Sequence, residues 1–437
     1  MSGARDLAGA RVAIDARPSA AFIAAMLGTW KAGGVVVPLA TSHPPAERDY
    51  VMSDSGASLV VSPQELLLHG DRSALPDIDP ARPALILYTS GTTARSKGVV
   101  TTHANIAAQV TSLITAWEWT AADRTLLVLP LHHVHGLINV VASALWSGAA
   151  CEILPRFDAA ATWSRLASGE VSVFTAVPTI YHRLIAAWDA APAAVQHAWS
   201  AGARGARLLM CGSAALPVTI LERWRDITGH TLLERYGMTE IGMALSNPLH
   251  GARRPGHVGS PLPGVQVRVV DDSGDVVQEG TPGEIEVRGP GVFAEYWQRP
   301  DETRAAFRDG WFRTGDVAVV SAAACRILGR RSVDIIKSGG HKISALEIEE
   351  VMRAHPAVSE CAVVAVPDPE WGERICAAVE LGQGQSLSLD DLRAWLSPRL
   401  APYKIPRALE CSRPLPRNAM GKVIKPEVAR WFTGDAG

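Results

Sequence analysis

The sequence predicts an α/β fold with a large N-terminal domain of layered, mostly parallel sheets, helices and a β-rich subdomain, followed by a small α+β C-terminal domain. Short apolar runs such as Leu126–Pro130, Ser172–Val177 and Ala206–Met210 alternate with helical segments. That alternation is typical of parallel sheets covered on both faces. The 437 residues are also too many for one ordinary core, so more than one domain is expected.

The N-terminal elements follow from their end signals. Ser19 is a candidate N-cap for a helix over Ser19–Lys31, which ends before Gly33-Gly34, and Val35–Pro38 has the apolar pattern of a strand. The apolar stretch of that helix is shorter than the roughly 20 residues that span a bilayer. The start of the chain lacks the basic residues and apolar run of a signal peptide. We therefore expect a buried helix and no membrane insertion.

The pattern of apolar residues changes once in the middle of the chain, from helical spacing to strand-like runs. Asn105–Trp117 has the apolar spacing of a helix, whereas Pro261–Val320 is rich in strand-like runs and glycine. The second segment is expected to form a smaller β-rich subdomain that completes the N-terminal domain. We place that whole domain at residues 1–329.

A compact α+β unit is expected at the C-terminal end. Ser344 and Glu347 have the spacing of a capping box that opens a helix. We predict a hinge over residues 330–334 and a C-terminal domain over residues 335–437. The further strands and helix are expected at Ala362–Val366, Ile375–Leu381, Ser388–Leu396 and Arg407–Glu410.

Composition excludes several classes of protein. A hydrophobic content of 47% with 20% charged residues is that of a globular chain. A formal net charge of −2 gives no general attraction to nucleic acid or to an anionic membrane. The six cysteines have no Cys-x-x-Cys spacing, which indicates neither a zinc site nor a disulfide framework. We therefore expect a cytoplasmic protein in a reducing compartment; the sequence does not indicate its oligomeric state.

One loop concentrates small hydroxyl side chains, glycine and a lysine. Tyr88–Gly98 lies between the apolar runs Ala84–Leu87 and Val99-Val100. Backbone N–H groups of a glycine-rich turn form a concave anion site, to which hydroxyls and the charge of Lys97 add. The usual P-loop pattern does not fit, because the lysine precedes the glycine. The loop is typical of polyphosphate binding, and a polar surface loop is the alternative.

Four later segments are polar at places where packing alone does not require it. Leu131–Gly136 holds three histidines, which suggest metal ligands. No cysteine or carboxylate cluster accompanies them, and neighbouring side chains of an extended segment point to different sides, so a polar pocket wall is favoured. Met210–Pro217 follows a strand, where α/β sheets bind ligands. Tyr236–Glu240 offers a ring, a hydroxyl and a carboxylate, and Trp311–Asp316 ends in an acid suited to a ribose diol.

Together and in this order, these segments resemble the adenylate-forming, AMP-binding superfamily of acyl-CoA synthetases, peptide-synthetase adenylation domains and luciferases. The resemblance runs from about Ser19 to Arg430. Within the superfamily the chain looks most like malonyl-CoA synthetases. The segments that carry the resemblance are Tyr88–Gly98, Pro130–Gly136, Val177–Arg183, Gly212–Pro217, Glu234–Met243, Arg313–Asp316, Gly329-Arg330, Lys337–Lys342 and Pro416–Lys422.

The resemblance implies a two-step reaction with ATP and CoA as co-substrates and Mg²⁺ as cofactor. A carboxylate attacks the α-phosphate of ATP, and the CoA thiol then displaces AMP from the acyl-adenylate. Bringing two anions together calls for cations and oriented donors. Lys422 matches the lysine between carboxylate and α-phosphate, Glu240 the Mg²⁺ ligand and Thr239 a phosphate-contacting hydroxyl. The further nucleotide-binding matches are Thr89, Ser90, Gly91, Thr92, Thr93, Lys97, Gly212, Ser213, Ala214, Glu234, Tyr236, Gly237, Asp316 and Arg330.

The resemblance also implies that the C-terminal domain is mobile. It rotates between the two steps, so that Lys422 withdraws and Ser338–Lys342 borders the channel for CoA, with the pivot in Arg330–Asp334. Two adjacent glycines allow close backbone approach, and a simple turn is the alternative. The implied CoA-binding residues are Ser338, Gly339, Gly340 and Lys342.

A dicarboxylate substrate such as malonate needs a cation for its distal carboxylate. Arg183 lies one turn after Pro178–Ile180, in the segment that lines the acyl pocket in relatives. A guanidinium group binds a planar carboxylate well, and Ser213 and His135 are expected to supplement it. The alternative for Arg183 is a solvated arginine on a helix.

Two departures from the family pattern leave alternatives open. Relatives usually carry Gly and Pro where this chain has Ala94 and Ser96, and a positive φ at Ala94 would cost roughly 1–2 kcal/mol. Members also usually have some tens of residues before the equivalent of Ala10. The hypotheses are a malonyl-CoA synthetase, a synthetase for methylmalonate or another short acid, and a degenerate adenylate-binding protein. The retained catalytic positions argue against the third.

Overall fold

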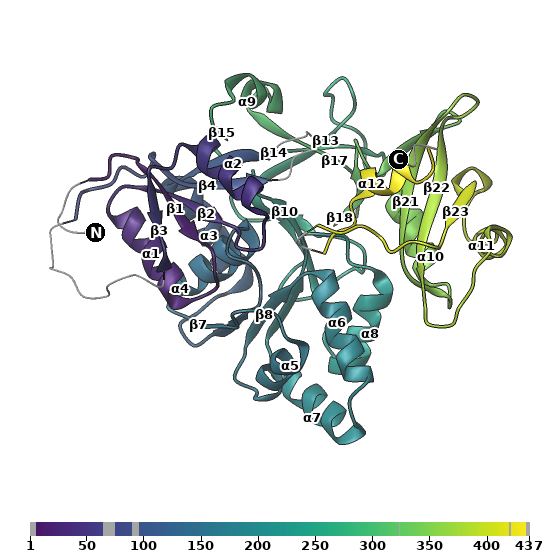
Figure 1. Ribbon diagram of the computed structural model, residues 1–437, viewed down its shortest axis with the longest axis horizontal. Coiled ribbons are helices and arrows are strands. Elements are labelled where there is room, and N and C mark those ends of the chain that lie inside the picture. The colour runs from purple at the N-terminus through teal and green to yellow at the C-terminus, as the bar shows by residue number, and fades with distance from the viewer. Residues whose placement is uncertain (1–5, 64–74, 90–95, 323, 419–420, 434–437) are drawn as a thin grey trace.

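A computed structural model describes residues 6–63, 75–89, 96–322, 324–418 and 421–433 of the chain. Its strands form four sheets. In Figure 1 the purple and blue N-terminal elements, the teal helices and the yellow-green C-terminal elements occupy three separate regions. Within the described ranges, no helix is long and apolar enough to cross a bilayer.

The first sheet is built mainly from the N-terminal segment. Its order is β15-β5-β4-β2-β1-β3, with β1 to β4 parallel and β5 antiparallel to β4. The expected N-cap is confirmed, because Ser19 Oγ accepts the N–H of Phe22. The strands are β1 (Arg11–Asp15), β2 (Val35–Leu39), β3 (Leu59–Val61), β4 (Pro83–Thr89), β5 (Lys97–Thr102) and β15 (Glu295–Tyr296). The neighbouring helices are α1 (Ala20–Lys31), α2 (Pro45–Ser55) and α3 (His103–Trp117).

The second sheet shares a large hydrophobic core with the first sheet. Strands β7, β6, β8, β9 and β10 are parallel, and β11 and β12 continue the sheet antiparallel. Trp163 and Trp224 stack under it with ring centroids 5.2 Å apart. The strands are β6 (Arg124–Leu127), β7 (Ala150–Ile153), β8 (Val173–Ala176), β9 (Leu208–Cys211), β10 (Leu233–Met238), β11 (Gly242–Ser246) and β12 (Ser260–Pro261). The helices are the π-helix η2 (His135–Ala142), α4 (Ser143–Ser147), α5 (Ala159–Ala167), α6 (Pro178–Asp189), α7 (Ala193–Ala203) and α8 (Val218–Thr228).

The third sheet is the β-rich subdomain expected from the sequence. It is antiparallel, with the order β13-β14-β17-β16 and β18 paired to β17. Its core is separate and aromatic, with Phe293, Phe307 and Phe312 in mutual ring contact. The elements are β13 (Gln266–Val270), β14 (Gly283–Arg288), α9 (Pro300–Ala306), β16 (Phe307–Arg308), β17 (Trp311–Ser321) and β18 (Ala324–Arg330).

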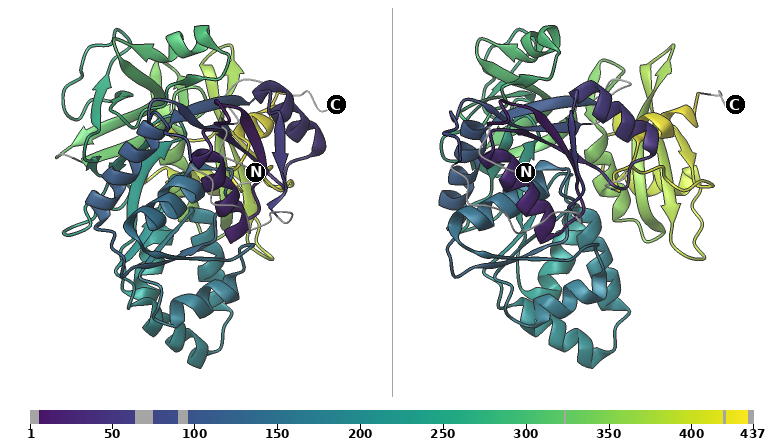
Figure 2. Two further views of the ribbon diagram at one scale, coloured as in Figure 1. Left: turned by 90° about the vertical axis from the view of Figure 1, so that its left-hand side faces the viewer. Right: turned by 60° about the vertical axis from the view of Figure 1, so that its left-hand side comes forward.

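The fourth sheet and its helices form the yellow-green part at the right of Figure 1, and the right-hand view of Figure 2 shows them beside the remaining sheets. The order is β20-β19-β22-β21, with β23 parallel to β22. Two hydrophobic clusters of its own cover its faces. The elements are β19 (Ile335–Ser338), β20 (His341–Ser344), α10 (Ala345–Arg353), β21 (Val358–Asp368), β22 (Gly372–Leu381), α11 (Leu389–Leu396), η3 (Pro402–Lys404), β23 (Ala408–Glu410) and α12 (Lys425–Arg430).

Two local expectations need correction. Ser344 caps α10 by accepting the N–H of Glu347, but the glutamate side chain pairs with Lys404 at 2.6 Å instead of closing a capping box. The histidine segment is not extended, because a turn after β6 leads into η2 at His135. A π-helix inside a chain often marks a functional site.

Candidate functional site

Polar side chains gather beyond the carboxyl ends of the parallel strands β8 and β9. Ser213 follows β9, and its Oγ lies 3.0 Å from Nδ1 of His135 at the start of η2. Nε2 of the same imidazole lies 2.9 Å from Oγ1 of Thr175 in β8. Ligands of α/β sheets bind at this edge. The structure therefore brings His135 and Ser213 together where the sequence predicts the substrate.

The turn after β9 has an unusual backbone. Ser213 has a φ of 70°, a left-handed conformation that is rare outside glycine and costs on the order of 1–3 kcal/mol. At Gly212, an added Cβ would collide with the guanidinium of Arg235. The turn is thus shaped around that arginine, and Ala214 follows it at the surface.

Arg235 in β10 is a buried cation that the sequence reasoning missed. Its Nη2 contacts His135 Nε2 and donates to Thr175 Oγ1 at 3.2 Å. Only 3% of the residue is exposed, and burial lowers the pKa of its guanidinium to about 10. No salt bridge to Arg235 forms among the described residues, and its Nε has no hydrogen-bond partner there. The sequence signal that could have identified Arg235 was its position inside Glu234–Met243, a segment that carries the family resemblance.

The burial of this cation also decides the charge of His135. Burial, and then the neighbouring Arg235, lower the pKa of His135 well below its usual value. The imidazole is therefore neutral at pH 7, with one ring nitrogen to donate and one to accept. The neutral imidazole of His135 and the hydroxyl of Ser213 can together orient a bound carboxylate without adding charge.

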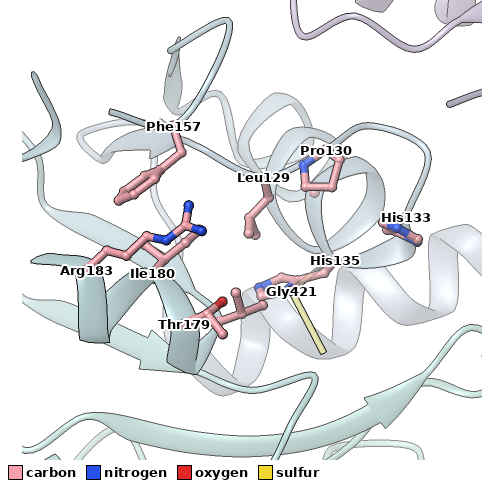
Figure 3. Close-up of a pocket in the computed structure, with 11 residues that line it drawn as sticks. Leu129, Pro130, His133, His135, Phe157, Thr179, Ile180, Arg183 and Gly421 are labelled. Carbon is pink, nitrogen blue, oxygen red and sulfur yellow. The ribbon is translucent and has the colours of Figure 1, made fainter. Parts of the chain in front are cut away.

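A cavity of about 180 Å³ opens beside this cluster (Figure 3). Arg183 and Thr179 reach it from α6, and Phe157 lies across from them. Gly421, from the segment that precedes α12, closes one side. The lining residues are Leu129, Pro130, His133, His135, Gly136, Phe157, Val177, Thr179, Ile180, Arg183 and Gly421.

A second polar group joins the second and third sheets. The hydroxyl of Tyr236 donates to Asp316 Oδ2 at 2.6 Å, and Arg330 Nε donates to Asp316 Oδ1 at 3.0 Å. Burial, and then the adjacent carboxylate, raise the pKa of Tyr236 well above its usual value. These three predicted nucleotide-binding residues, which are 80 and 14 positions apart along the chain, are therefore in direct contact.

The predicted metal ligand lies in the same group. Glu240 is 6% exposed, and its Oε1 accepts the hydroxyl of Tyr296 at 3.0 Å. Burial raises the pKa of Glu240, although Tyr296 and Arg330 oppose that shift. Thr239 precedes it in the turn between β10 and β11. The described residues hold no cluster of three or more metal-ligating side chains.

Lys97 begins β5 and lies over the ring of Tyr296, with Nζ 5.2 Å from its centroid. Its ammonium pairs with the carboxylate of Glu302. Thr89 ends β4 directly opposite Lys97 in the antiparallel register. The predicted phosphate-binding residues Ser90, Gly91, Thr92 and Thr93, together with Ala94, lie outside the described residues.

Two predicted nucleotide-binding positions have structural explanations. An added Cβ at Gly237 would collide with the carbonyl of Gly242, so this glycine permits the close β10–β11 pairing. Glu234 is buried, and its Oε1 accepts the N–H of Gly256 at 2.9 Å. Burial raises the pKa of Glu234 to about 8.

Glu234 makes stability depend on pH. Between the usual glutamate pKa of 4.5 and the raised pKa of about 8, the folded chain holds a proton that the unfolded chain releases. The stability that this residue contributes therefore falls as pH rises through that range. Glu234→Gln keeps the neutral shape, so its stability relative to wild type should rise steadily from pH 5 to pH 8 in urea unfolding. A difference that is independent of pH would contradict the buried, protonated glutamate.

Lys422 lies in a tight turn near the cavity. The N–H of Lys422 donates to Asn418 Oδ1 at 3.0 Å, and its carbonyl accepts the N–H of Asn418 at 2.9 Å. The neighbouring Gly421 approaches Thr179 of α6, because an added Cβ would lie 3.6 Å from its side chain. The structure thus holds the lysine-bearing turn against the cavity wall.

The predicted CoA-binding segment forms a β-hairpin turn. Gly339 and Gly340 have φ values of 56° and 80°, as a two-residue turn between β19 and β20 requires. Lys342 pairs with Asp272 of the third sheet at 3.0 Å, and Ser338 is buried at the end of β19. None of these four predicted residues lines the described cavity.

Comparisons with known proteins show which proteins this chain is similar to. The sequence model of the AMP-binding enzyme family matches residues 7–77 and 62–297, and that of the AMP-binding enzyme C-terminal domain matches residues 347–422. The mitochondrial malonate–CoA ligase of Mus musculus is 45% identical over 481 residues, which cover 97% of this chain and 82% of that protein.

Two solved structures differ in how well they superpose on this chain. ATP-bound MatB from Rhodopseudomonas palustris has a TM-score of 0.88 at 34% identity, over 98% of this chain and 89% of that one. A malonyl-CoA ligase with methylmalonyl-CoA and AMP bound has a TM-score of 0.68 at 40% identity, over 93% and 91%. The α/β fold expected from the sequence is confirmed by these likenesses.

Proposed function

The chain belongs to the AMP-binding enzyme family, and from that premise we propose that it is an AMP-forming acyl-CoA synthetase acting on malonate. Malonate and ATP react to give malonyl-adenylate and pyrophosphate, and CoA then gives malonyl-CoA and AMP. The observation that carries the malonate assignment is the buried Arg235, which forms no salt bridge among the described residues and contacts His135 on the wall of a small cavity. The sequence similarity to a malonate–CoA ligase over 97% of the chain supports it.

The cavity favours a short acid. Its volume of about 180 Å³ is below the roughly 300–1,000 Å³ of pockets for drug-sized ligands. Phe157 and Ile180 provide apolar walls, whereas His135 and Arg183 provide polar ones. A long acyl chain would have to pass these polar groups, at the cost of their hydration.

Two arginines are candidates for the distal carboxylate of malonate. Arg183 lines the cavity and is exposed, whereas Arg235 is buried behind His135. A buried cation without a counter-ion is costly unless an anion binds next to it. We propose that Arg235, through the neighbouring His135 and Ser213, is the main partner of the carboxylate, and that Arg183 assists at the solvent side.

Substitutions of Arg183 and Arg235 are expected to raise the KM for malonate by different factors. Arg183→Ala should raise the KM for malonate up to about fivefold, because an exposed ion pair contributes roughly 0–1 kcal/mol. Arg235→Met should raise it about 30-fold or more, because a buried charge pair contributes about 2 kcal/mol or more. Neither change should alter the KM for butyrate, which has no distal carboxylate. Equal effects on both acids would contradict the assignment.

The nucleotide is proposed to bind across Tyr236, Asp316 and Arg330, with adenine against the tyrosine and ribose hydroxyls on the aspartate. Each carboxylate oxygen of Asp316 accepts one hydrogen bond in the structure and can accept another. Lys97 lies over the ring of Tyr296, whose hydroxyl bonds Glu240, and would meet the phosphates. Thr239 and the loop after Thr89 would add hydroxyl donors.

Mg²⁺ is proposed to bind at Glu240. A single buried carboxylate fits this ion, which usually takes one or two protein carboxylates beside phosphate oxygens and water. Burial raises the pKa of this carboxyl, and a nearby cation would favour its charged form. The ion would supply charge stabilisation at the phosphates. The hydroxyl of Tyr296 would keep the carboxylate oriented.

We also propose that the part of the chain after residue 334 moves between the two steps, about the hinge 330–334. Gly421 on the cavity wall suits the first step, in which Lys422 meets the α-phosphate. The higher TM-score against the ATP-bound relative than against the product complex supports this assignment. The hairpin of Ser338 to Lys342 would replace the Lys422 turn in the second step.

A malonate-dependent assay tests the function. We expect pyrophosphate release and formation of a CoA thioester with malonate, no thioester without CoA, and neither product without ATP. Faster turnover with methylmalonate would favour that acid, which a relative's structure contains as its CoA ester. ATP binding without turnover of any short dicarboxylate would favour a degenerate adenylate-binding protein.

The cellular location belongs to the same proposal. All six cysteines are free thiols, which supports a reducing compartment and therefore the cytoplasm.

A further inference from the structure

We propose that Tyr50 is a positioning residue for Lys97, and that it acts by holding the peptide group between Ser96 and Lys97. This inference rests on the proposed role of Lys97 in binding the phosphates of ATP. Tyr50 lies in α2, 47 positions before the lysine in sequence, and belongs to none of the sites described above.

The contact is direct. The hydroxyl of Tyr50 donates to the carbonyl oxygen of Ser96 at 2.9 Å. That carbonyl and the N–H of Lys97 belong to the same planar peptide group. Fixing the carbonyl therefore fixes the direction in which the chain enters β5 and in which the Lys97 side chain leaves it.

Asp54 keeps the tyrosine proton available for this bond. It lies one helical turn after Tyr50, so both side chains share one face of α2. Asp54 Oδ1 accepts from Arg299 at 3.0 Å, and its Oδ2 accepts from Tyr88 at 2.7 Å. The Tyr50 hydroxyl lies 3.3 Å from Oδ1, further than from the Ser96 carbonyl.

The same network reaches the other end of Lys97. Arg299 Nε lies 3.6 Å from Glu302, and Glu302 pairs with the ammonium of Lys97. The backbone of the lysine is thus held through Tyr50 and its side chain through Glu302. Arg299 contacts both partners and joins the two restraints.

The sequence explains why this chain would need the bond. Position 96 is serine, so no proline ring fixes the backbone just before Lys97. Proline fixes φ near −65° and removes the freedom of the backbone. Serine leaves that freedom, so a hydrogen bond from a neighbouring helix can restore the restraint that the missing ring would supply.

Tyr50→Phe tests the proposal with the full chain. The variant keeps the ring and removes only the hydroxyl. We expect the Kd for ATP, measured by calorimetry without malonate, to rise about fivefold, since one hydrogen bond contributes about 1 kcal/mol. The KM for malonate and the rate of thioester formation from supplied malonyl-AMP should stay within twofold of wild type.

Arg48→Met is the control. It removes a charged group from the same helix, α2, which pairs with Asp15 rather than with Ser96. Its Kd for ATP should stay near that of wild type. Equal rises in both variants, or a wild-type Kd in Tyr50→Phe, would overturn the proposal. A wild-type chain that does not bind ATP would overturn the proposed function as well, so the two failures are distinguishable.

Discussion

Lys422→Ala is expected to abolish adenylation of malonate while sparing thioester formation from supplied malonyl-AMP. The lysine would neutralise charge where the carboxylate meets the α-phosphate, and loss of one such group costs about 10²–10³ in rate. The second step would use the other arrangement of the C-terminal segment, in which Lys422 is absent from the site. Malonate-dependent ATP–pyrophosphate exchange measures the first step alone.

The structure makes this prediction specific. Two hydrogen bonds link Asn418 to the backbone of Lys422 and do not involve the lysine ammonium. Alanine therefore leaves both bonds intact, and Gly421 remains against Thr179. Thioester formation serves as the internal control for folding. Loss of both half-reactions to the same degree would contradict alternation between two arrangements.

Lys425→Met is expected to lower the free energy of unfolding by about 3–5 kcal/mol, the cost of removing one partner from a buried ion pair. Lys425 Nζ lies 2.5 Å from Asp334 Oδ1 and 2.7 Å from Glu349 Oε1. Burial lowers the pKa of Lys425, but the two carboxylates overcome that effect and raise it. Methionine would leave Asp334 buried without this cation, and Glu349 with Arg353 alone, whose Nη2 lies 3.5 Å from its Oε2.

Urea unfolding of the full chain measures the change, and Lys342→Met is the control. The Lys342–Asp272 pair is also within hydrogen-bond distance, but both side chains are about two-thirds exposed. Water screens an exposed pair, so its loss should change stability by at most about 1 kcal/mol. Similar effects of the two variants would mean that the Lys425 cluster is solvated.

This cluster also connects the proposed hinge with the catalytic turn. Asp334 Oδ2 accepts the N–H of Arg330 at 3.0 Å, and Lys425 follows Lys422 by three residues. Burial by itself would raise the pKa of Asp334. Lys425 and the N–H of Arg330 lower this pKa by more than burial raises it, so the carboxylate stays charged. A rotation about residues 330–334 would therefore carry Asp334 and Lys425 together.

The regular elements were largely predictable, because their signals are local. Apolar periodicity located α3 and the parallel strands, Ser19 capped α1 as expected, and the helix expected from Ser388 forms as α11. The capping box at Ser344 failed for a tertiary reason, since Lys404 competes for the Glu347 carboxylate from 57 residues away. The π-helix at His135 was not predicted, because its pattern of apolar residues also suits a strand or an α-helix.

The residues of the candidate site were likewise predictable from local motifs, whereas their long-range contacts were not. Family motifs identified Tyr236, Asp316 and Arg330, and the structure places their side chains in contact. Lys97 was singled out by its loop, but its pairing with Glu302 has no sequence signal.

The sequence by itself determined the fold class, the order of the elements and the polar segments at the ends of strands, since each depends on neighbours in the chain. Only the tertiary structure decided that Arg235 is a buried cation beside His135 and that Tyr50 holds Ser96. Burial and long-range hydrogen bonds set the charge and orientation of a side chain, and both arise from residues that meet only when the sheets pack.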